Sequence, residues 1–168
     1  MKYICSKCGQ EHEGRPAIGF DSPYHYDTLS QEEKDTIATL SEDFCTITYD
    51  DQTDRFIRGV IHMQVNDDCE TLDYGAWVSL SESSFNDYKE NFHNENHEVT
   101  YFGYICNNLT GYSDTLSVKA NVVTRGKTRP EIIPHDDQMD NEFVKDYYEG
   151  IDKATAEQRI RQLLRQQE

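Results

Sequence analysis

The chain has 168 residues, of which 36% are hydrophobic, and this size predicts one domain whose core needs no disulfide bonds. It carries 32 acidic residues against 16 basic ones, and a formal net charge of −16 disfavours binding to nucleic acid or to anionic membranes. The N-terminal residues Met1–Cys5 offer too short an apolar run for a secretory signal or a membrane span, so we expect a cytoplasmic protein.

The first segment carries half of a zinc-binding pattern. Cys5 and Cys8 have the Cys-x-x-Cys spacing, and two thiolates at this spacing can bind one tetrahedral ion from a tight turn that Gly9 favours. No second Cys-x-x-Cys follows, so a complete site would draw on His12, His25, Cys45 or Cys106. The sequence predicts zinc on Cys5, Cys8, His12 and His25, with two reduced thiols in an N-terminal turn as the open alternative.

A helix and a hairpin are predicted next along the chain. Ser30 and Glu33 have the spacing of a capping box, which predicts a helix over residues 31–40. Residues 44–49 alternate between apolar and polar side chains, and residues 55–65 continue this alternation after an acidic turn. The two runs predict a β-hairpin.

The central stretch, residues 74–85, predicts a buried strand that leads directly into a helix. Its aromatic and aliphatic run contains Trp77, the single tryptophan of the chain, which we expect to anchor the core. Ser81 can cap a helix over residues 82–92, because its hydroxyl can accept an otherwise unpaired backbone N–H. Phe85, Tyr88 and Phe92 then form one apolar stripe.

The C-terminal half predicts further strands and a final helix. His93 and His97 could share a metal on a continued helix, but the asparagines between them favour a turn. Strands are expected at residues 101–106, where Gly103 suggests a bulge or a close backbone approach, and at residues 115–125. A turn at Gly126, an extended segment at 129–134 and an acidic loop at 135–141 precede a helix over residues 154–166.

Together these elements predict an α+β fold. We expect a twisted, mainly antiparallel sheet of about five or six strands covered by three helices, with an N-terminal Cys/His turn. The expected single domain comprises an irregular segment at residues 1–28, a sheet core at 29–151 and a C-terminal helix at 152–168.

Clusters of carboxylates fall in the predicted connecting segments, where they can face solvent or a basic partner. The acids that we predict to bind a partner are Asp67, Asp68, Glu70, Asp73, Asp136 and Asp137.

Taken together, several short motifs resemble a bacterial family of small proteins whose domain has no known function. The motifs are Cys5-x-x-Cys8-Gly9-x-x-His12, Phe44-Cys45, Phe56-Ile-Arg58-Gly59, Tyr74-Gly-Ala-Trp-Val-Ser-Leu-Ser81 with Phe85, Tyr101-Phe-Gly103, Leu109-x-x-Tyr112-x-x-Thr115-Leu116, Arg129-Pro130 and Gly150-Ile151. The resemblance covers nearly the whole chain and implies its boundaries and its Cys/His cluster, but no established reaction.

The charge leads us to expect a non-catalytic acidic binding protein. An immunity or inhibitor protein that masks a basic effector such as a nuclease toxin fits best, because carboxylates can take the place of phosphates on a nuclease surface. The alternative is a zinc-dependent, hydrolase-like enzyme that uses the N-terminal Cys/His cluster.

Overall fold

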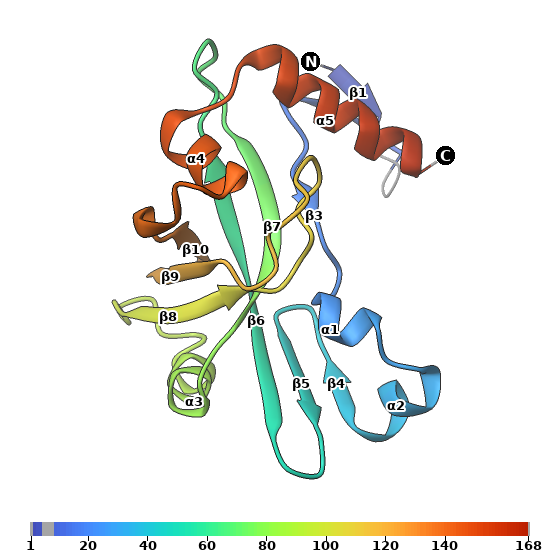
Figure 1. The fold of residues 1–168 in the computed structure, drawn as a ribbon, viewed down its shortest axis with the longest axis vertical. Coiled ribbons are helices and arrows are strands. Elements are labelled where there is room, and N and C mark those ends of the chain that lie inside the picture. Colours follow the sequence, from blue (N-terminus) through green and yellow to red (C-terminus); the bar gives the residue numbers. More distant parts are fainter. Residues whose placement is uncertain (1, 5–8, 168) are drawn as a thin grey trace.

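The computed structural model describes residues 2–4 and 9–167, and its elements alternate irregularly between strands and helices (Figure 1). The strands are β1 Lys2–Ile4, β2 Glu11–Glu13, β3 Ile18–Gly19, β4 Ala38–Leu40, β5 Phe44–Thr48, β6 Thr53–Met63, β7 Leu72–Ser79, β8 Thr100–Ile105, β9 Lys119–Arg125 and β10 Thr128–Pro134. The helices are α1 Tyr24–Asp27, α2 Gln31–Thr36, α3 Glu82–Glu90, the short 3-10 helix η1 Asp136–Gln138, α4 Glu142–Glu149 and α5 Lys153–Gln166. The predicted α+β class is confirmed.

Five of the strands close into a barrel in the order β6-β7-β8-β9-β10, and β10 returns to β6 in parallel at Glu131 and Val60. The other neighbours in the barrel pair antiparallel, with the longest ladder between β6 and β7. The sheet is mainly antiparallel, as predicted, but it has eight strands and not five or six, and part of it closes on itself.

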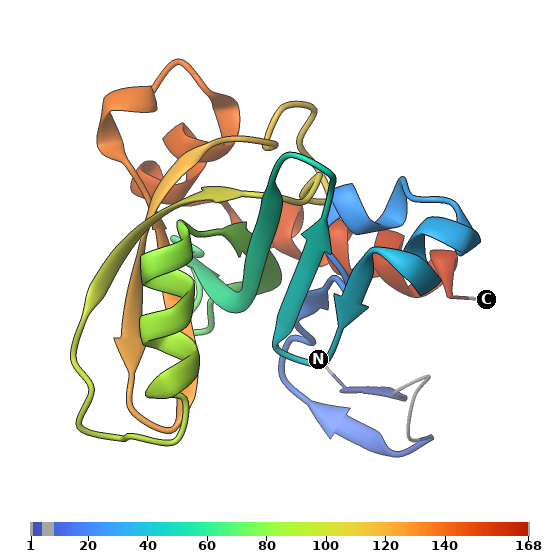
Figure 2. The same ribbon diagram turned by 90° about the horizontal axis from the view of Figure 1, so that it is seen from below.

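Three further strands extend the sheet beyond the barrel: β3 pairs with β7, β5 pairs with β6, and β4 pairs with β5. β7 pairs with β8 near its C-terminal end and with β3, in parallel, near its N-terminal end. β6 pairs with β5 near its start and with β10 farther along, and β4 extends the sheet beyond β5. Figure 2 shows the consequence, with α3 against one side of the barrel and the β4–β5 hairpin, α1 and α2 on another side.

Two glycines permit the close approaches that the barrel requires. A Cβ atom on Gly59 would lie 2.8 Å from Ile132 and 2.9 Å from the Pro130 carbonyl oxygen, so only glycine lets β10 approach β6. A Cβ atom on Gly103 would lie 2.6 Å from the Ser79 carbonyl oxygen. The close backbone approach predicted at Gly103 is thus confirmed.

The buried apolar residues form two clusters. The larger one includes Ile57, Ile61 and Val122 from the barrel strands and Phe143 from α4. The smaller one contains Phe56, Cys45, Cys106 and the fully buried Trp77, whose indole Nε1 donates a hydrogen bond to the Phe20 carbonyl over 3.0 Å. Trp77 is a core anchor, as predicted.

The helices follow their predicted caps, with one error and two additions. Ser30 forms the capping box, but α2 stops at Thr36 and residues 38–40 pair with β5 as β4. Edge pairing overrides the predicted helix here, in a run rich in β-branched side chains. Ser81 caps α3 as predicted, and α5 is present, whereas α1 and α4 were not predicted.

The predicted strand at residues 115–125 is shorter in the structure. Ser117 has a positive φ of 66°, and regular pairing begins only at Lys119. The side chain of Thr115 instead holds the preceding turn, since its hydroxyl donates to the Asn107 carbonyl and accepts from the Leu109 N–H. Within the described residues, no helix has both the length and the apolar character to cross a membrane.

Candidate partner-binding surface

The predicted zinc site lies mainly outside the described residues. Cys5 and Cys8 are not among them, and the side chain of His12 is not described either. His25 lies on α1, with its ring stacked on Phe56 at 5.5 Å and its Nδ1 shielded and without a hydrogen-bond partner. In the part of the chain that is described, no three Cys, His, Asp or Glu side chains gather as a metal site, so zinc stays a prediction.

The other two cysteines considered as ligands are buried in the smaller apolar cluster. Burial is the main cause that raises the pKa of the Cys45 thiol to about 12 and that of Cys106 to about 11. Both side chains pack there as small apolar groups.

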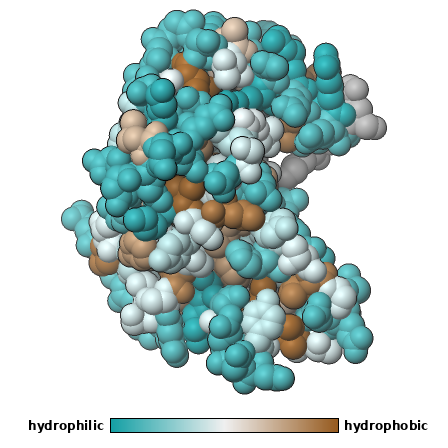
Figure 3. Space-filling model, viewed as in Figure 1, coloured by the Kyte–Doolittle hydropathy of each residue, from teal (hydrophilic) through white to brown (hydrophobic). Residues whose placement is uncertain are grey.

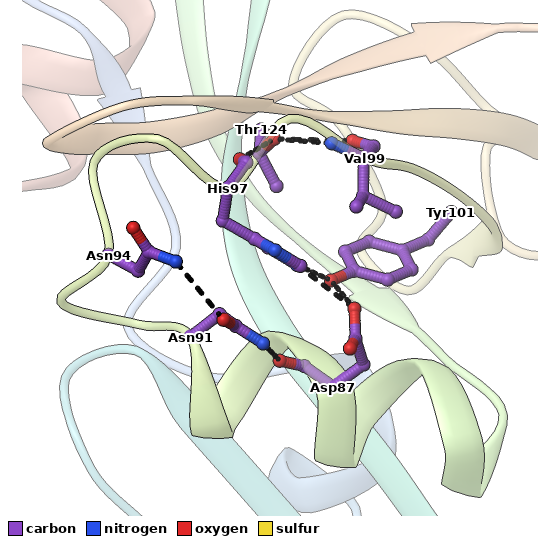
Figure 4. A network of polar contacts seen from close by, with 7 residues as sticks. All are labelled: Asp87, Asn91, Asn94, His97, Val99, Tyr101 and Thr124. Atoms are coloured by element: carbon purple, nitrogen blue, oxygen red, sulfur yellow. Dashed lines mark hydrogen bonds and ion pairs between the residues drawn. The ribbon is translucent and has the colours of Figure 1, made fainter.

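His93 and His97 lie in the turns after α3 and not on a continued helix, as the asparagines between them indicated. His97 Nε2 lies 2.9 Å from both Asp87 Oδ2 and the Tyr101 hydroxyl, and Tyr101 donates to Asp87 over 2.7 Å (Figure 4). The hydrogen bond from Tyr101, followed by His97, holds the pKa of Asp87 below its usual value. The network joins α3, the segment after it and β8, although the sequence suggested only the His-His spacing.

The same network fixes the segment between α3 and β8. The Thr124 hydroxyl on β9 donates to the His97 carbonyl and accepts from the Val99 N–H (Figure 4). A pocket of about 470 Å³ lies beside it, but its cations are already paired: Arg125 with Glu131, Lys127 with Glu95 and Arg129 with Asp43. These contacts account for the histidine and the arginines without a ligand.

The predicted acids fall into two groups, and the first lies at the connection between β6 and β7. We call Asp67, Asp68, Glu70 and Asp73 the connection acids. Asp68 pairs with Arg15 at 2.5 Å and with Lys153 at 3.4 Å, and Asp67 accepts the backbone N–H of Lys153 over 2.7 Å. Asp73 lies 2.8 Å from His62 Nδ1. Three of the four acids therefore hold parts of the fold together.

Asp68 has the most strongly shifted carboxylate of this group. The backbone N–H of Glu70, followed by Arg15, lowers its pKa to about 2. Arg15 also donates to the carbonyls of Glu70 and Thr71, so it joins the N-terminal segment to the connection. Ile151, at the start of α5, pairs with the same connection through Val65 and through the Gln64 carbonyl.

The second group lies on η1 and α4. We call residues 135–149 the acidic segment, because it contains six carboxylates and one lysine. Asp137 pairs with Lys119 at 3.3 Å and Asp146 with Arg159 at 3.8 Å. Among the described residues no basic side chain lies within 4 Å of the remaining four, Asp136, Asp140, Glu142 and Glu149.

The local sequence explains why these carboxylates are free. The side chain of Asn141 accepts the N–H groups of Phe143 and Val144, so α4 is capped without using an aspartate or a glutamate. Phe143 and Val144 are fully buried and fix the helix on the barrel. The four unpaired acids, Asp136, Asp140, Glu142 and Glu149, are left exposed.

A small acidic pocket opens at the start of this segment. It has a volume of about 220 Å³ and is lined by Asp114, Asp140 and Glu142 together with Tyr112 and Phe143. None of the three carboxylates pairs with a cation in the part of the chain that is described. The arrangement fits an ammonium or guanidinium group, and its carboxylates do not gather as a metal site.

Two large apolar side chains are exposed within the acidic segment. Met139 is 38% exposed and Tyr148 is 44% exposed. The Tyr148 hydroxyl donates to the Pro134 carbonyl, which holds the ring beside the end of β10. Figure 1 places α4 on the side of the barrel opposite β3. Methionine and tyrosine are enriched in protein interfaces, so this surface combines charge with apolar contact area.

Comparison with known proteins gives one match. A family model described as an uncharacterised protein conserved in bacteria (DUF2199) matches residues 4–151. No curated protein and no solved structure matches the chain.

Proposed function

The chain belongs to this family of uncharacterised bacterial proteins, and we propose that it is a non-catalytic binding protein whose acidic segment engages a basic protein partner. The observation that carries the proposal is the pocket formed by Asp114, Asp140 and Glu142, beside exposed Met139. Here unpaired carboxylates and exposed apolar side chains occur together, in a chain of net charge −16.

The pocket defines how the partner is recognised. Three carboxylates without cations favour an inserted lysine or arginine side chain, whose apolar stem can pack on the partly buried Tyr112 in the same wall. Met139 and Tyr148 supply apolar contacts around this anchor. Interfaces gain most of their affinity from a few such anchors, while the surrounding charges raise the association rate and select the partner.

The kind of partner follows from the charge pattern. A basic effector that binds nucleic acid presents cations spaced for phosphates, and the carboxylates of the acidic segment can occupy those cations. The proposal is therefore an immunity or inhibitor protein that masks such an effector, for example a nuclease toxin. The zinc-hydrolase alternative rests on Cys5 and Cys8, which lie outside the described residues.

The experiment is capture of proteins from host lysate with the tagged chain at physiological salt, followed by mass spectrometry. The test variant carries Asp136→Asn, Asp140→Asn and Glu142→Gln. The control carries Asp50→Asn, Asp51→Asn and Glu90→Gln, which remove the same charge from exposed positions elsewhere. We expect one basic protein to be retained by the wild type and by the control but lost with the test variant.

Two results would contradict the proposal. Equal retention by the test variant would show that the acidic segment is not the interface. Equal loss with both variants would show that only net charge matters, as in nonspecific attraction.

A further inference from the structure

Arg58 on β6 is exceptional among the arginines of the structure. Four other arginines, Arg15, Arg55, Arg129 and Arg159, are at least partly buried, and each has a carboxylate within ion-pair distance. Arg58 is also partly buried, but among the described residues it has no carboxylate partner. Its Nε is shielded from solvent and makes no hydrogen bond.

An unpaired guanidinium is unexpected at this position. A shielded donor without an acceptor destabilises the folded protein. With twice as many acidic as basic residues in the chain, a carboxylate partner would be easy to supply, as it is for the other four partly buried arginines. Among the partly buried arginines of the described residues, Arg58 is thus the one whose guanidinium has no carboxylate partner.

An indole ring and two glycines surround the guanidinium of Arg58. Arg58 pairs across the ladder with Trp77, and its guanidinium carbon lies 6.0 Å from the centre of an indole ring. Nη2 extends toward the parallel pair of Gly19 and Gly75, where it lies 3.5 Å and 4.0 Å from the positions that Cβ atoms would occupy. A Cβ at either position would contact the fork at ordinary van der Waals distance, so the glycines leave this side of the fork uncovered by side chains of their own.

The surface is hollowed near these residues. Figure 3 shows a notch between the part of the molecule that carries α5 and the part that carries α1 and α2. In Figure 1, the segment that leads from β3 to α1 runs along the inner end of this notch. Gly19, the last residue of β3, is exposed, so the neighbourhood of Nη2 reaches the surface at this residue.

We infer that Arg58 binds the oxyanion of a small ligand, a carboxylate or a phosphate group, in this notch. Both groups match the planar fork, which can donate two parallel hydrogen bonds to them. Trp77 lies beneath the guanidinium, and the two glycines place no side chain against Nη2. The site lies on the β3 side of the barrel, away from the acidic segment, so it is independent of the proposed protein partner.

The single tryptophan provides the readout, because Trp77 lies against the guanidinium. Its fluorescence is measured while sodium phosphate or sodium acetate replaces sodium chloride at constant ionic strength. We expect a saturable change with at least one of the two anions. A response to phosphate alone assigns a phosphate-bearing ligand, and a response to acetate alone assigns a carboxylate.

Variants separate a specific site from a general effect of anions. Arg58→Gln should weaken the response about 10-fold to 100-fold, since it removes charge-assisted hydrogen bonds. Arg58→Lys keeps the charge but loses the fork and should also weaken it. Arg55→Gln removes a paired arginine of the same strand and should leave the response unchanged.

Thermal unfolding supplies a second measurement. The bound anion should raise the Tm of the wild type relative to chloride, and should not do so for Arg58→Gln. The inference is overturned if neither anion gives a saturable response, or if Arg58→Gln responds as the wild type does.

Discussion

The connection acids and the acidic segment look alike in the sequence, yet the structure uses them in opposite ways. Asp68 has cations on two sides, from Arg15 and Lys153, and its pKa falls to about 2. Within the described residues, Asp136 and Asp140 have no cation within ion-pair distance. A cluster of acids therefore indicates an interface only where the fold leaves its carboxylates unpaired.

The difference arises from which neighbours each group meets. The β6–β7 connection lies under the N-terminal segment and the start of α5, which bring Arg15 and Lys153 to it. The acidic segment is anchored by buried Phe143 and capped by Asn141, so its fold needs none of the free carboxylates. Stability experiments should separate the two groups.

The largest effect on stability is expected from Arg15. Arg15→Met removes the donor to Asp68 and to the Glu70 and Thr71 carbonyls, and should lower the free energy of unfolding by about 1–3 kcal/mol. Urea unfolding measures the change. The matched control is Arg125→Met, which removes an exposed pair with Glu131 and should cost less than about 1 kcal/mol. Equal losses would mean that the connection is not held by Arg15.

The next largest effect is the loss of stability at low pH that Asp68 causes. Because the folded pKa is lowered from 3.8 to about 2, the stabilisation is complete above about pH 4 and is lost as the pH falls toward 2. Asp68→Asn should lower stability at neutral pH and flatten the pH dependence in this window. Urea unfolding at several pH values checks this. Asp136→Asn is the control and should keep the wild-type dependence of stability on pH. If Asp68→Asn also kept this dependence, another group would cause the acid sensitivity.

Parts of the fold could be predicted from the sequence because they depend on local patterns. The caps at Ser30 and Ser81, the hairpin of residues 44–65 and the buried Trp77 each follow from neighbouring residues. Barrel closure does not, since it depends on the pairing of β10 with β6 and on contacts at Gly59 that no local pattern encodes.

The candidate site was only half predictable for the same reason. Asp136 and Asp137 could be predicted from charge alone. The pocket also needs Asp114, which precedes β9 in the chain, whereas Asp140 follows β10, and only the fold brings the two together. The roles of the connection acids depend on Arg15 and Lys153, which lie far from them in the sequence. The helix α4 was missed because the acidic composition before it suggested only a loop.

The smallest effect on stability is expected from the acidic segment. Asp136→Asn, Asp140→Asn and Glu142→Gln together should change the free energy of unfolding by no more than about 0.5 kcal/mol per site, since none has an ion-pair partner. The wild type and the triple variant are compared by urea unfolding. A loss above about 2 kcal/mol would show that these acids are structural, like Asp68.

The most direct test of the central claim is an NMR titration of the ¹⁵N-labelled protein with a short arginine-rich peptide at physiological salt. The account predicts that the largest backbone amide shifts fall in residues 135–149 and around Asp114, with weak shifts at the connection acids. In the variant Asp136→Asn, Asp140→Asn and Glu142→Gln these shifts should disappear. Shifts spread evenly over all acidic surfaces, or centred on residues 64–73, would contradict the account.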